Sequence, residues 1–352
     1  MPAPLDLARR SRAKLSYTTR NIRPEALAGL VDDRAPEAGD VVLARVTAIG
    51  QHKRIEGPDG RRGTLFEGDE IIVCYGDRYA PDQFEAVVPE DLGPCHLAAA
   101  GGIAATVLSA HADMGSPTAV EPVGLCTTAD GEVVNLRSWR LPEPPAPADR
   151  PFTVAVLGTS MNAGKTTTAA GLARGMVCAG YAVGAAKVTG TGAGGDKWLL
   201  ADAGADPVLD FTSAGLASTY RCTPEQVEDS LRTLHGHLAE RAVDVAVLEV
   251  ADGLLQAETA ALIRSDVFRA TVDAVVFAAG DAMGAIAGVA ALRALDLPVV
   301  AVSGVLTCSP LAMGEAAATI DLPVLNLDDL WRGAHDVLPP VLDPLPVAAG
   351  GG

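Results

Sequence analysis

The stretch Gly158-Thr159-Ser160-Met161-Asn162-Ala163-Gly164-Lys165-Thr166 decides the fold of the second half of this chain. It fits the pattern G-x-x-x-x-G-K-[ST], in which four residues between the glycines let successive backbone N–H groups curl around phosphates. An apolar strand expected over 153–157 precedes the stretch, and a helix expected over 164–179 follows it with its positive end toward the phosphates. This context predicts a P-loop that binds a nucleoside triphosphate together with Mg²⁺.

The loop residues divide the work of binding between backbone and side chains. We expect Lys165 to reach the β- and γ-phosphates from an exposed position, and the Thr166 hydroxyl to ligate Mg²⁺. The residues that we expect to contact the nucleotide are Gly158, Thr159, Ser160, Met161, Asn162, Ala163, Gly164, Lys165, Thr166 and Thr167.

The remainder of this half alternates buried strands with helices. Strands are expected over 182–188, 244–250, 274–279 and 298–303, and helices over 224–241, 256–264 and 282–294. Strands that are apolar on both faces and joined by helices are typical of a parallel sheet covered on both sides. The fold class that we expect is therefore α/β, with a mainly parallel sheet carrying the P-loop.

A proline-rich stretch separates this half from the first. Four prolines between Leu141 and Arg150 predict an extended linker. Before it, short β-branched runs separated by turn signals predict a smaller, mainly β domain that resembles a barrel; these runs are 41–49, 63–65, 71–75, 85–88, 120–125 and 133–136. We expect an N-terminal domain with a basic arm at 1–140, the linker at 141–150, the P-loop domain at 151–335 and a C-terminal tail at 336–352.

Charge and composition limit the classes of molecule that this protein is expected to bind. The 352 residues carry a net charge of −17, which argues against a nucleic-acid surface because phosphate binding needs a basic face. No apolar run approaches the length that spans a bilayer, and the basic residues near the N-terminus indicate a flexible arm or a transit peptide more than a secretory signal. Six scattered cysteines without a C-x-x-C pair favour reduced thiols. We expect a cytoplasmic protein, a homodimer that binds a small molecule and neither nucleic acid nor membrane.

Charged residues at strand ends supply candidates for the chemistry. Glu249 ends a strand that should be central, so its carboxylate should face the ligand crevice and not serve as a surface acid. The second strand should deliver Lys187 to the same crevice, and Asp196 follows the glycine-rich loop beyond it. We assign Thr166, Asp196 and Glu249 to the magnesium and Lys165 and Lys187 to catalysis. Candidate substrate residues are Asp210 and Thr189.

These residues resemble the dethiobiotin synthetase branch of P-loop proteins over about 152–330. In that family a loop G-T-x-x-x-x-G-K-T is followed by a strand-end lysine, an aspartate and a Glu-Gly type motif, matched here by the loop, Lys187, Asp196 and Glu249. The resemblance implies an ATP- and Mg²⁺-dependent reaction. Val188 stands where that family has proline, Ser303 stands where it has asparagine, and the Glu-Gly run is altered over 249–253. The segment 189–215 is also similar to P-loop relatives of D-glutamate N-acetyltransferases.

Three functions remain open. The first is an ATP-dependent kinase or ligase acting on a small molecule, since such chemistry needs positioning and charge neutralisation but no protein nucleophile. The second is an acyltransferase that keeps the loop for a phosphate-bearing carrier, and the third is a nucleotide-driven switch or metallochaperone. Against the third, the loop lacks a second lysine, no N-K-x-D sequence is visible, and His235 and His237 point to different faces of one helix.

The N-terminal domain offers one further candidate. The turn Tyr75-Gly76-Asp77-Arg78-Tyr79 combines aromatics, an acid and a cation. A polar loop around a buried tyrosine is the simpler interpretation, and the alternative is that Arg78 reaches a bound anion.

Overall fold

The computed structural model describes residues 3–144 and 149–337, and the chain forms two compact units. The N-terminal unit comprises 1–142 together with 190–195 and 211–223, and the P-loop unit comprises the remainder. Two short segments from the second half of the chain thus pack with the N-terminal unit. The domain boundaries expected from the sequence assigned both segments to the P-loop domain. Prolines 145 and 147 of the expected linker and nearly all of the expected tail lie outside the described residues.

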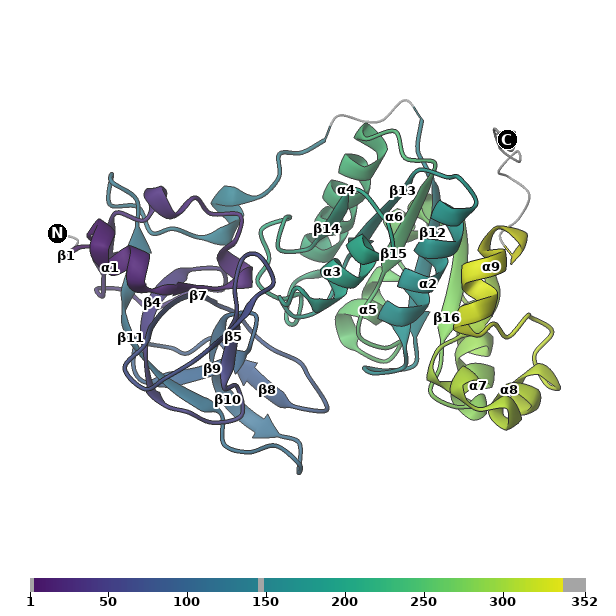
Figure 1. The fold of residues 1–352 in the computed structure, drawn as a ribbon, viewed down its shortest axis with the longest axis horizontal. Helices are drawn as coiled ribbons and strands as arrows, with labels where there is room; N and C mark the ends of the chain where they lie inside the picture. The colour runs from purple at the N-terminus through teal and green to yellow at the C-terminus, as the bar shows by residue number, and fades with distance from the viewer. Residues whose placement is uncertain (1–2, 145–148, 338–352) are drawn as a thin grey trace, which may run out of the picture. The chain divides into compact units, whose positions relative to one another are not determined.

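The P-loop unit is built on a six-stranded parallel sheet (Figure 1). The strand order is β14-β13-β15-β12-β16-β17. The strands are β12 (Phe152–Gly158), β13 (Val183–Lys187), β14 (Val208–Asp210), β15 (Val245–Glu249), β16 (Ala274–Ala278) and β17 (Val299–Ser303). This arrangement confirms the α/β class, and β15 is a central strand as expected.

Helices cover both faces of this sheet. They are α2 (Lys165–Cys178), α3 (Gly195–Asp202), α4 (Pro224–Glu240), α5 (Ala257–Leu262), α6 (Asp266–Thr271), α7 (Ala282–Arg293), α8 (Pro310–Ala317) and α9 (Leu327–Val337), with a 3₁₀ turn η4 (Val305–Cys308). The helix expected over 256–264 is confirmed as α5, and the short helix α6 that follows it was not foreseen. α5 ends at Leu262, and Ser265 caps the N-terminus of α6, because its side chain accepts a hydrogen bond from the Phe268 N–H.

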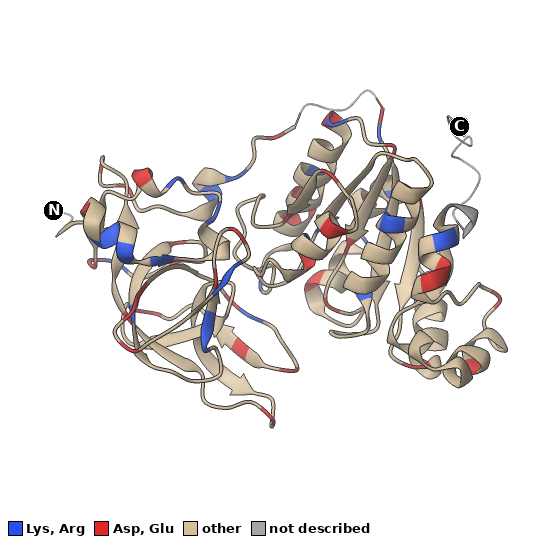
Figure 2. Ribbon diagram, viewed as in Figure 1, with Lys and Arg blue, Asp and Glu red and all other residues tan. Residues whose placement is uncertain are grey.

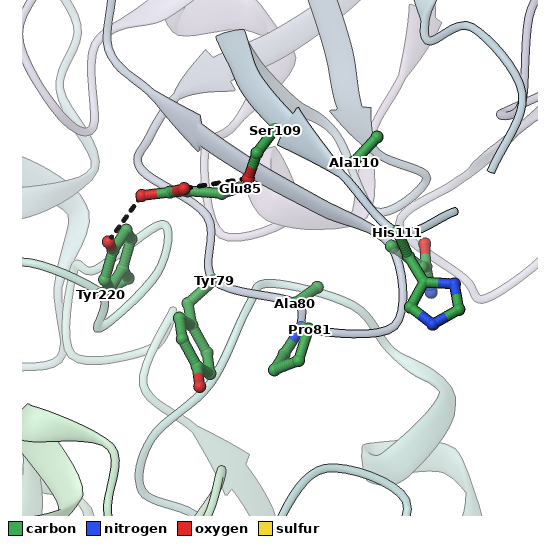
Figure 3. Close-up of a pocket in the computed structure, with 9 residues that line it drawn as sticks. Tyr79, Ala80, Pro81, Glu85, Ser109, Ala110, His111 and Tyr220 are labelled. Carbon is green, nitrogen blue, oxygen red and sulfur yellow. Dashed lines mark hydrogen bonds between the residues drawn. The ribbon is translucent and has the colours of Figure 1, made fainter. Parts of the chain in front are cut away.

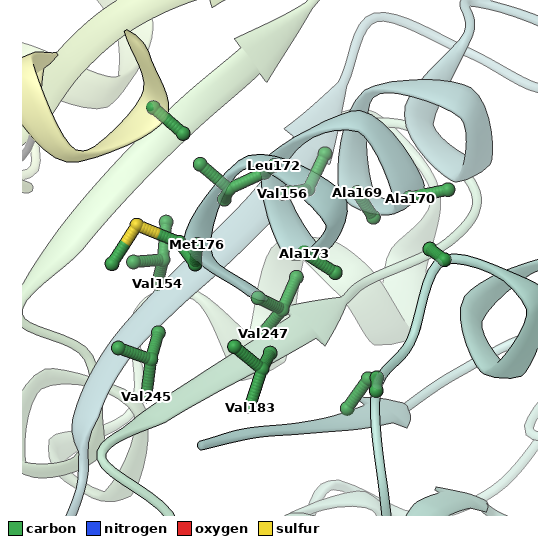
Figure 4. Close-up of a cluster of buried hydrophobic side chains, with 14 of the residues drawn as sticks. Val154, Val156, Ala169, Ala170, Leu172, Ala173, Met176, Val183, Val245 and Val247 are labelled. Carbon is green, nitrogen blue, oxygen red and sulfur yellow. The ribbon is translucent and has the colours of Figure 1, made fainter. Parts of the chain in front are cut away.

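Alternating residues of the central strands point to opposite faces of the sheet, and each face packs against its own helices. Val154 and Val156 of β12 face Leu172 and Met176 of α2, in a core that α3 and α9 complete (Figure 4). On the sheet, Phe277 packs against α7, where a Cβ at Gly288 would lie 2.1 Å from the Phe277 ring. Only glycine allows the helix to approach the sheet so closely at this point.

The N-terminal unit contains a closed barrel. Its ring of paired strands is β11 (Thr118–Thr127), β4 (Val41–Ala48), β7 (Glu70–Tyr75), β10 (Ile103–Ala110) and β9 (Cys95–Ala99), which returns to β11. The ring is antiparallel except between β7 and β10. The expected barrel is thus confirmed, although β9 and β10 were not foreseen because alanine, a weak strand former, interrupts both sequences.

Other short elements flank the barrel. They are β1 (Ala3–Pro4), α1 (Leu7–Arg12), β2 (Lys14–Leu15), η1 (Tyr17–Thr19), η2 (Pro24–Ala26), β3 (Gly29–Val31), β5 (Arg54–Glu56), β6 (Arg62–Thr64), β8 (Phe84–Val87) and η3 (Leu136–Trp139). The strand expected over 133–136 is reduced to two isolated bridges, Val133 with Thr127 and Asn135 with Asp40, before η3 begins. Alternate residues such as Val42 and Leu43 of β4 belong to two different cores, so both faces of the barrel wall are buried.

The basic N-terminal segment is part of this unit. Figure 2 shows its basic residues on α1, where the Arg9 guanidinium forms an ion pair with Glu70 at 2.6 Å. Arg10 donates to the Leu27 carbonyl at 2.9 Å, and Lys14 pairs with Asp69. The segment is therefore packed and paired, and the expectation of a flexible arm is wrong. In the described part of the chain, no helix is both long and apolar enough to cross a bilayer.

Candidate functional site

The glycine loop connects β12 to α2 at the carboxyl edge of the parallel sheet. Its backbone bends through left-handed conformations at Asn162, with φ 63°, and at Gly164, with φ 95°. A Cβ at Gly164 would lie 3.0 Å from the Gly304 Cα and the Val305 nitrogen, so this position requires glycine for space as well as for φ. The Val305 N–H donates to the Ala163 carbonyl at 3.0 Å. The loop is therefore braced by the segment that follows β17 and leads into the N-terminus of α2, as an anion cradle requires.

Lys165 lies at the first position of α2 and is only 5% exposed. Its Nζ donates to the Ser160 carbonyl at 2.8 Å, so the side chain folds back over the loop. Burial lowers the pKa of Lys165, and the carboxylates of Glu249 and Asp252 oppose that shift. The expected exposed position is wrong, because the loop that curls around the phosphate site also encloses the lysine.

Thr166, Asp196 and Glu249 come together, as expected for the metal side of the site. The Thr166 Oγ1 donates to Glu249 Oε1 at 3.0 Å and lies 3.2 Å from Asp196 Oδ1. The Glu249 side chain is 2% exposed, and its Oε2 is buried with no hydrogen-bond partner among the described residues. A buried carboxylate oxygen with an unmet acceptor beside a hydroxyl and a second carboxylate fits Mg²⁺, which prefers oxygen ligands.

Protein groups alone would not complete that coordination shell. Within residues 3–144 and 149–337, no group of three or more His, Cys, Asp and Glu side chains is arranged to hold a metal. Magnesium usually keeps several waters and takes one or two carboxylates together with substrate phosphates. The set of one hydroxyl and two carboxylates therefore fits a metal that arrives with a nucleotide.

Lys187 links the two carboxylates. Its Nζ forms an ion pair with Asp196 and lies 3.8 Å from Glu249 Oε1. Burial would lower the pKa of Lys187, but the carboxylates of Glu249 and Asp196 outweigh burial and raise it, so the ammonium stays charged. Burial raises the pKa of Glu249, and Lys187 counters that rise. The buried ammonium thus holds two acids close together at the carboxyl ends of β13 and β15.

These groups line one cavity of about 380 Å³ within the P-loop unit. Three of its lining residues, Ala251, Asp252 and Val305, were not foreseen. The signal for Asp252 is its place three residues after the strand-end Glu249. Val305 has no sequence signal, because it reaches the loop only through the parallel packing of β17. The full lining is Met161, Asn162, Gly164, Lys165, Thr166, Thr167, Lys187, Asp196, Glu249, Ala251, Asp252 and Val305.

The two candidate substrate residues lie beside this cavity and do not line it. Asp210 ends β14, is 2% exposed, and is the register partner of Lys187 on β13. Thr189 is also buried, and its Oγ1 donates to the Ala251 carbonyl. Through that bond Thr189 supports the chain segment that carries Asp252. Contact with a substrate stays a prediction for both residues.

Arg78 is not available to a bound anion as hypothesised. It is 5% exposed, and its guanidinium donates to Ala98 and Gln83 and lies 3.1 Å from the His52 Nε2. All of these partners belong to the N-terminal unit. Arg78 is therefore a buried structural cation that joins the segment after β7 to β9.

Comparison with known proteins leaves the family open. No family model matches the chain, and no curated protein matches it. Among solved structures, the chain is similar to the signal recognition particle 54 kDa protein from Aeropyrum pernix in complex with GDP, with 21% identity and a TM-score of 0.38 over 53% of this chain and 44% of that chain. It is also similar to the signal recognition particle receptor FtsY from Elizabethkingia anophelis, with 18% identity and a TM-score of 0.33 over 57% of this chain and 62% of that chain.

The chain spans less than two thirds of the length of either protein. Likeness at these TM-scores carries no conclusion about activity or partners. The strand order, the loop and the helix that follows it identify a P-loop nucleotide-binding scaffold.

Proposed function

We propose that the P-loop unit is a small-molecule kinase or ligase that uses ATP with Mg²⁺. The observation that carries the proposal is the convergence of Thr166, Asp196 and Glu249 with two lysines around one cavity. Such a set can hold a metal-bound triphosphate and still offer a second cation, Lys187, to an anionic acceptor or to the phosphoryl group in transfer. The resemblance to dethiobiotin synthetase supports the same reaction class.

Each residue has a distinct part in the proposed reaction. Backbone N–H groups of the loop and the N-terminus of α2 bind the phosphates, and Lys165 turns from the Ser160 carbonyl toward the β- and γ-phosphates. Thr166 and the two carboxylates would hold Mg²⁺, which neutralises charge on the phosphates.

The transfer itself needs no protein nucleophile. An acceptor oxygen or nitrogen forms a bond to the terminal phosphorus, the bond from that phosphorus to the bridging oxygen breaks, and the nucleoside diphosphate leaves with the electron pair. Lys187 is placed to stabilise negative charge during that step, because Glu249 and Asp196 keep its ammonium protonated. For a ligase, the phosphorylated acceptor then reacts with a second group and releases phosphate.

The test is a screen for ADP release with candidate small acids, alcohols and amines. The proposal expects ADP release that depends on one acceptor and yields a phosphorylated or ligated product visible by mass spectrometry. Slow hydrolysis that no acceptor accelerates would favour the nucleotide switch instead. Acyl transfer from coenzyme A without any triphosphate would favour the acyltransferase.

Paired lysine variants connect the activity to the loop. Lys165→Ala should abolish turnover, because it removes the cation that reaches the phosphates. Lys197→Ala is the matched control, since Lys197 follows Asp196 on α3 but does not line the cavity. Far-ultraviolet circular dichroism checks that both variants fold. Turnover of Lys165→Ala at the parent's rate would remove the loop from the reaction.

A further inference from the structure

A second cavity, of about 290 Å³, lies entirely within the N-terminal unit. It opens beside the pairing of β8 with β10, and residues 79–81 and Tyr220 complete its walls. Figure 3 shows Tyr79 and Tyr220 on one side of this space and His111 on the other. Its volume is just below the range of about 300–1,000 Å³ that is usual for ligand pockets, so it suits a small molecule.

Glu85 is the centre of the polar lining. It sits opposite Ser109 in the pairing of β8 with β10, and the Ser109 Oγ donates to Glu85 Oε2 at 3.0 Å. The Tyr220 hydroxyl donates to Glu85 Oε1 at 3.2 Å. Two neutral hydroxyls therefore orient the carboxylate without neutralising its charge. Because both hydroxyls donate to Glu85, the polar cluster presents acceptor lone pairs to the cavity.

The other residues that line the cavity also favour a positively charged ligand. Among the described residues that line the cavity, none is a lysine or an arginine, and Glu85 is the one carboxylate. The Tyr79 and Tyr220 rings lie 5.5 Å apart at their centroids and are tilted by 45°. Aromatic faces attract a cation through their quadrupole, and an oriented carboxylate attracts it by charge.

We propose that this cavity binds a small organic cation, an alkylammonium or guanidinium group, with Glu85 as its counter-charge and the two tyrosines as its aromatic walls. An anionic ligand would meet the negative charge of Glu85 with no lysine or arginine among the described lining residues, and a neutral ligand would leave the carboxylate without a counter-charge. The alternative is that the hydroxyls and Glu85 merely hold Tyr220 against β8, in which case no cation binds.

Calorimetric titration of the full chain without nucleotide tests the proposal separately from the P-loop chemistry. The probes are ethylammonium, methylguanidinium and tetramethylammonium chlorides, with N-methylurea as the neutral match for methylguanidinium and sodium acetate as the anion. We expect saturable binding of at least one cation at one site per chain, weakened by added salt, and no binding of N-methylurea or acetate. Failure of all three cations to saturate up to about 10 mM would overturn the proposal.

Variants locate the site. Glu85→Gln keeps the size of the side chain and removes the charge, so cation affinity should fall at least tenfold. Glu90→Gln, an exposed acid after β8 that does not line the cavity, should leave affinity unchanged. If Glu85→Gln does not fold, Tyr79→Leu decides the question, because it keeps bulk and removes one aromatic face. Parent affinity in a folded Glu85→Gln or Tyr79→Leu protein would overturn the assignment.

Discussion

Replacing Lys187 with methionine tests the ion cluster at the centre of the P-loop site. The change keeps an unbranched side chain of similar length and removes the ammonium. Asp196 then loses its ion-pair partner, and Glu249 loses a cation 3.8 Å from its Oε1. Because Glu249 is 2% exposed, little water can replace the lost cation, and Lys165 is a remaining cation that acts on its carboxylate.

The structure sets the size of the effect. At 3.8 Å and an effective dielectric constant of about 20, the Coulomb attraction between Lys187 and Glu249 is about 4 kcal/mol. Removing one partner of a buried pair costs about 3–5 kcal/mol, because the other charge stays buried and uncompensated. Lys187→Met should therefore lower the free energy of unfolding of the P-loop unit by about 3 kcal/mol. The double variant with Glu249→Gln should recover part of that loss.

Urea unfolding followed by tryptophan fluorescence measures this loss. Trp198 and Trp331 belong to the P-loop unit and Trp139 to the N-terminal unit, so the experiment uses a Trp139→Phe background. Arg269→Met is the matched control, because it breaks an exposed ion pair with Asp266 at 3.5 Å on α6 of the same unit. That control should change the unfolding midpoint little.

The destabilisation caused by Lys187→Met should depend on pH in a definite direction. Burial raises the pKa of Glu249, and removing Lys187 raises it further. A carboxyl group whose folded pKa is raised is favoured while it is protonated, and that contribution is lost as pH rises through the folded pKa. The difference between Lys187→Met and parent should therefore be larger at pH 7 than near pH 5. An unchanged urea midpoint at pH 7, or a difference that grows on acidification, would refute this account of the cluster.

Three further predictions follow from single features. Asp196→Asn should raise the Mg²⁺ concentration needed for nucleotide binding, whereas Asp202→Asn, an exposed acid on the same helix, should not; equal Mg²⁺ titrations would place Asp196 outside the metal site. Burial lowers the pKa of His52 and of His235 from 6.5 to about 4. As pH falls from about 6.5 to 4, these histidines therefore bind protons in the unfolded chain but not in the folded one. Each histidine should lower the free energy of unfolding by up to about 3 kcal/mol over this pH range. Replacing one by glutamine should make the free energy of unfolding, measured by urea titration, depend less on pH between these values. ATP should displace a fluorescent nucleotide at lower concentration than GTP, because the chain has no N-K-x-D sequence; the reverse order in a competition assay would contradict this.

The P-loop unit was largely predictable because its signals are local. Strand, loop and helix follow one another along 152–178, and each buried strand reads as a continuous apolar run. A strand-end residue in a parallel sheet reaches the carboxyl edge whatever the order of the strands, which is why Lys187 and Glu249 could be placed together from sequence. The helix expected over 256–264 formed as α5, whereas α6 was missed although Ser265 offers it an N-terminal cap.

The barrel of the N-terminal unit was harder to predict from the sequence. Its strands β9 and β10 are rich in alanine, so their composition is a weak signal for a strand. β7 pairs with β10 in parallel although more than two dozen residues separate them along the chain, so no hairpin turn predicts this pairing. The closing of the ring depends on β9 pairing with both β10 and β11, which is a property of register across the whole sheet.

The sequence by itself determined that the second half of the chain carries a glycine loop of the phosphate-binding pattern, and it determined which charged residues end the neighbouring strands. Those facts follow from spacing and hydrophobic period within short windows. Only the tertiary structure decided that Lys165 is enclosed, that Asp252 and Val305 line the cavity, and that Glu85 of β8 meets Tyr220 from far along the chain. The physical reason is that burial and side-chain pairing depend on which surfaces meet when distant segments pack, and no local pattern encodes that choice.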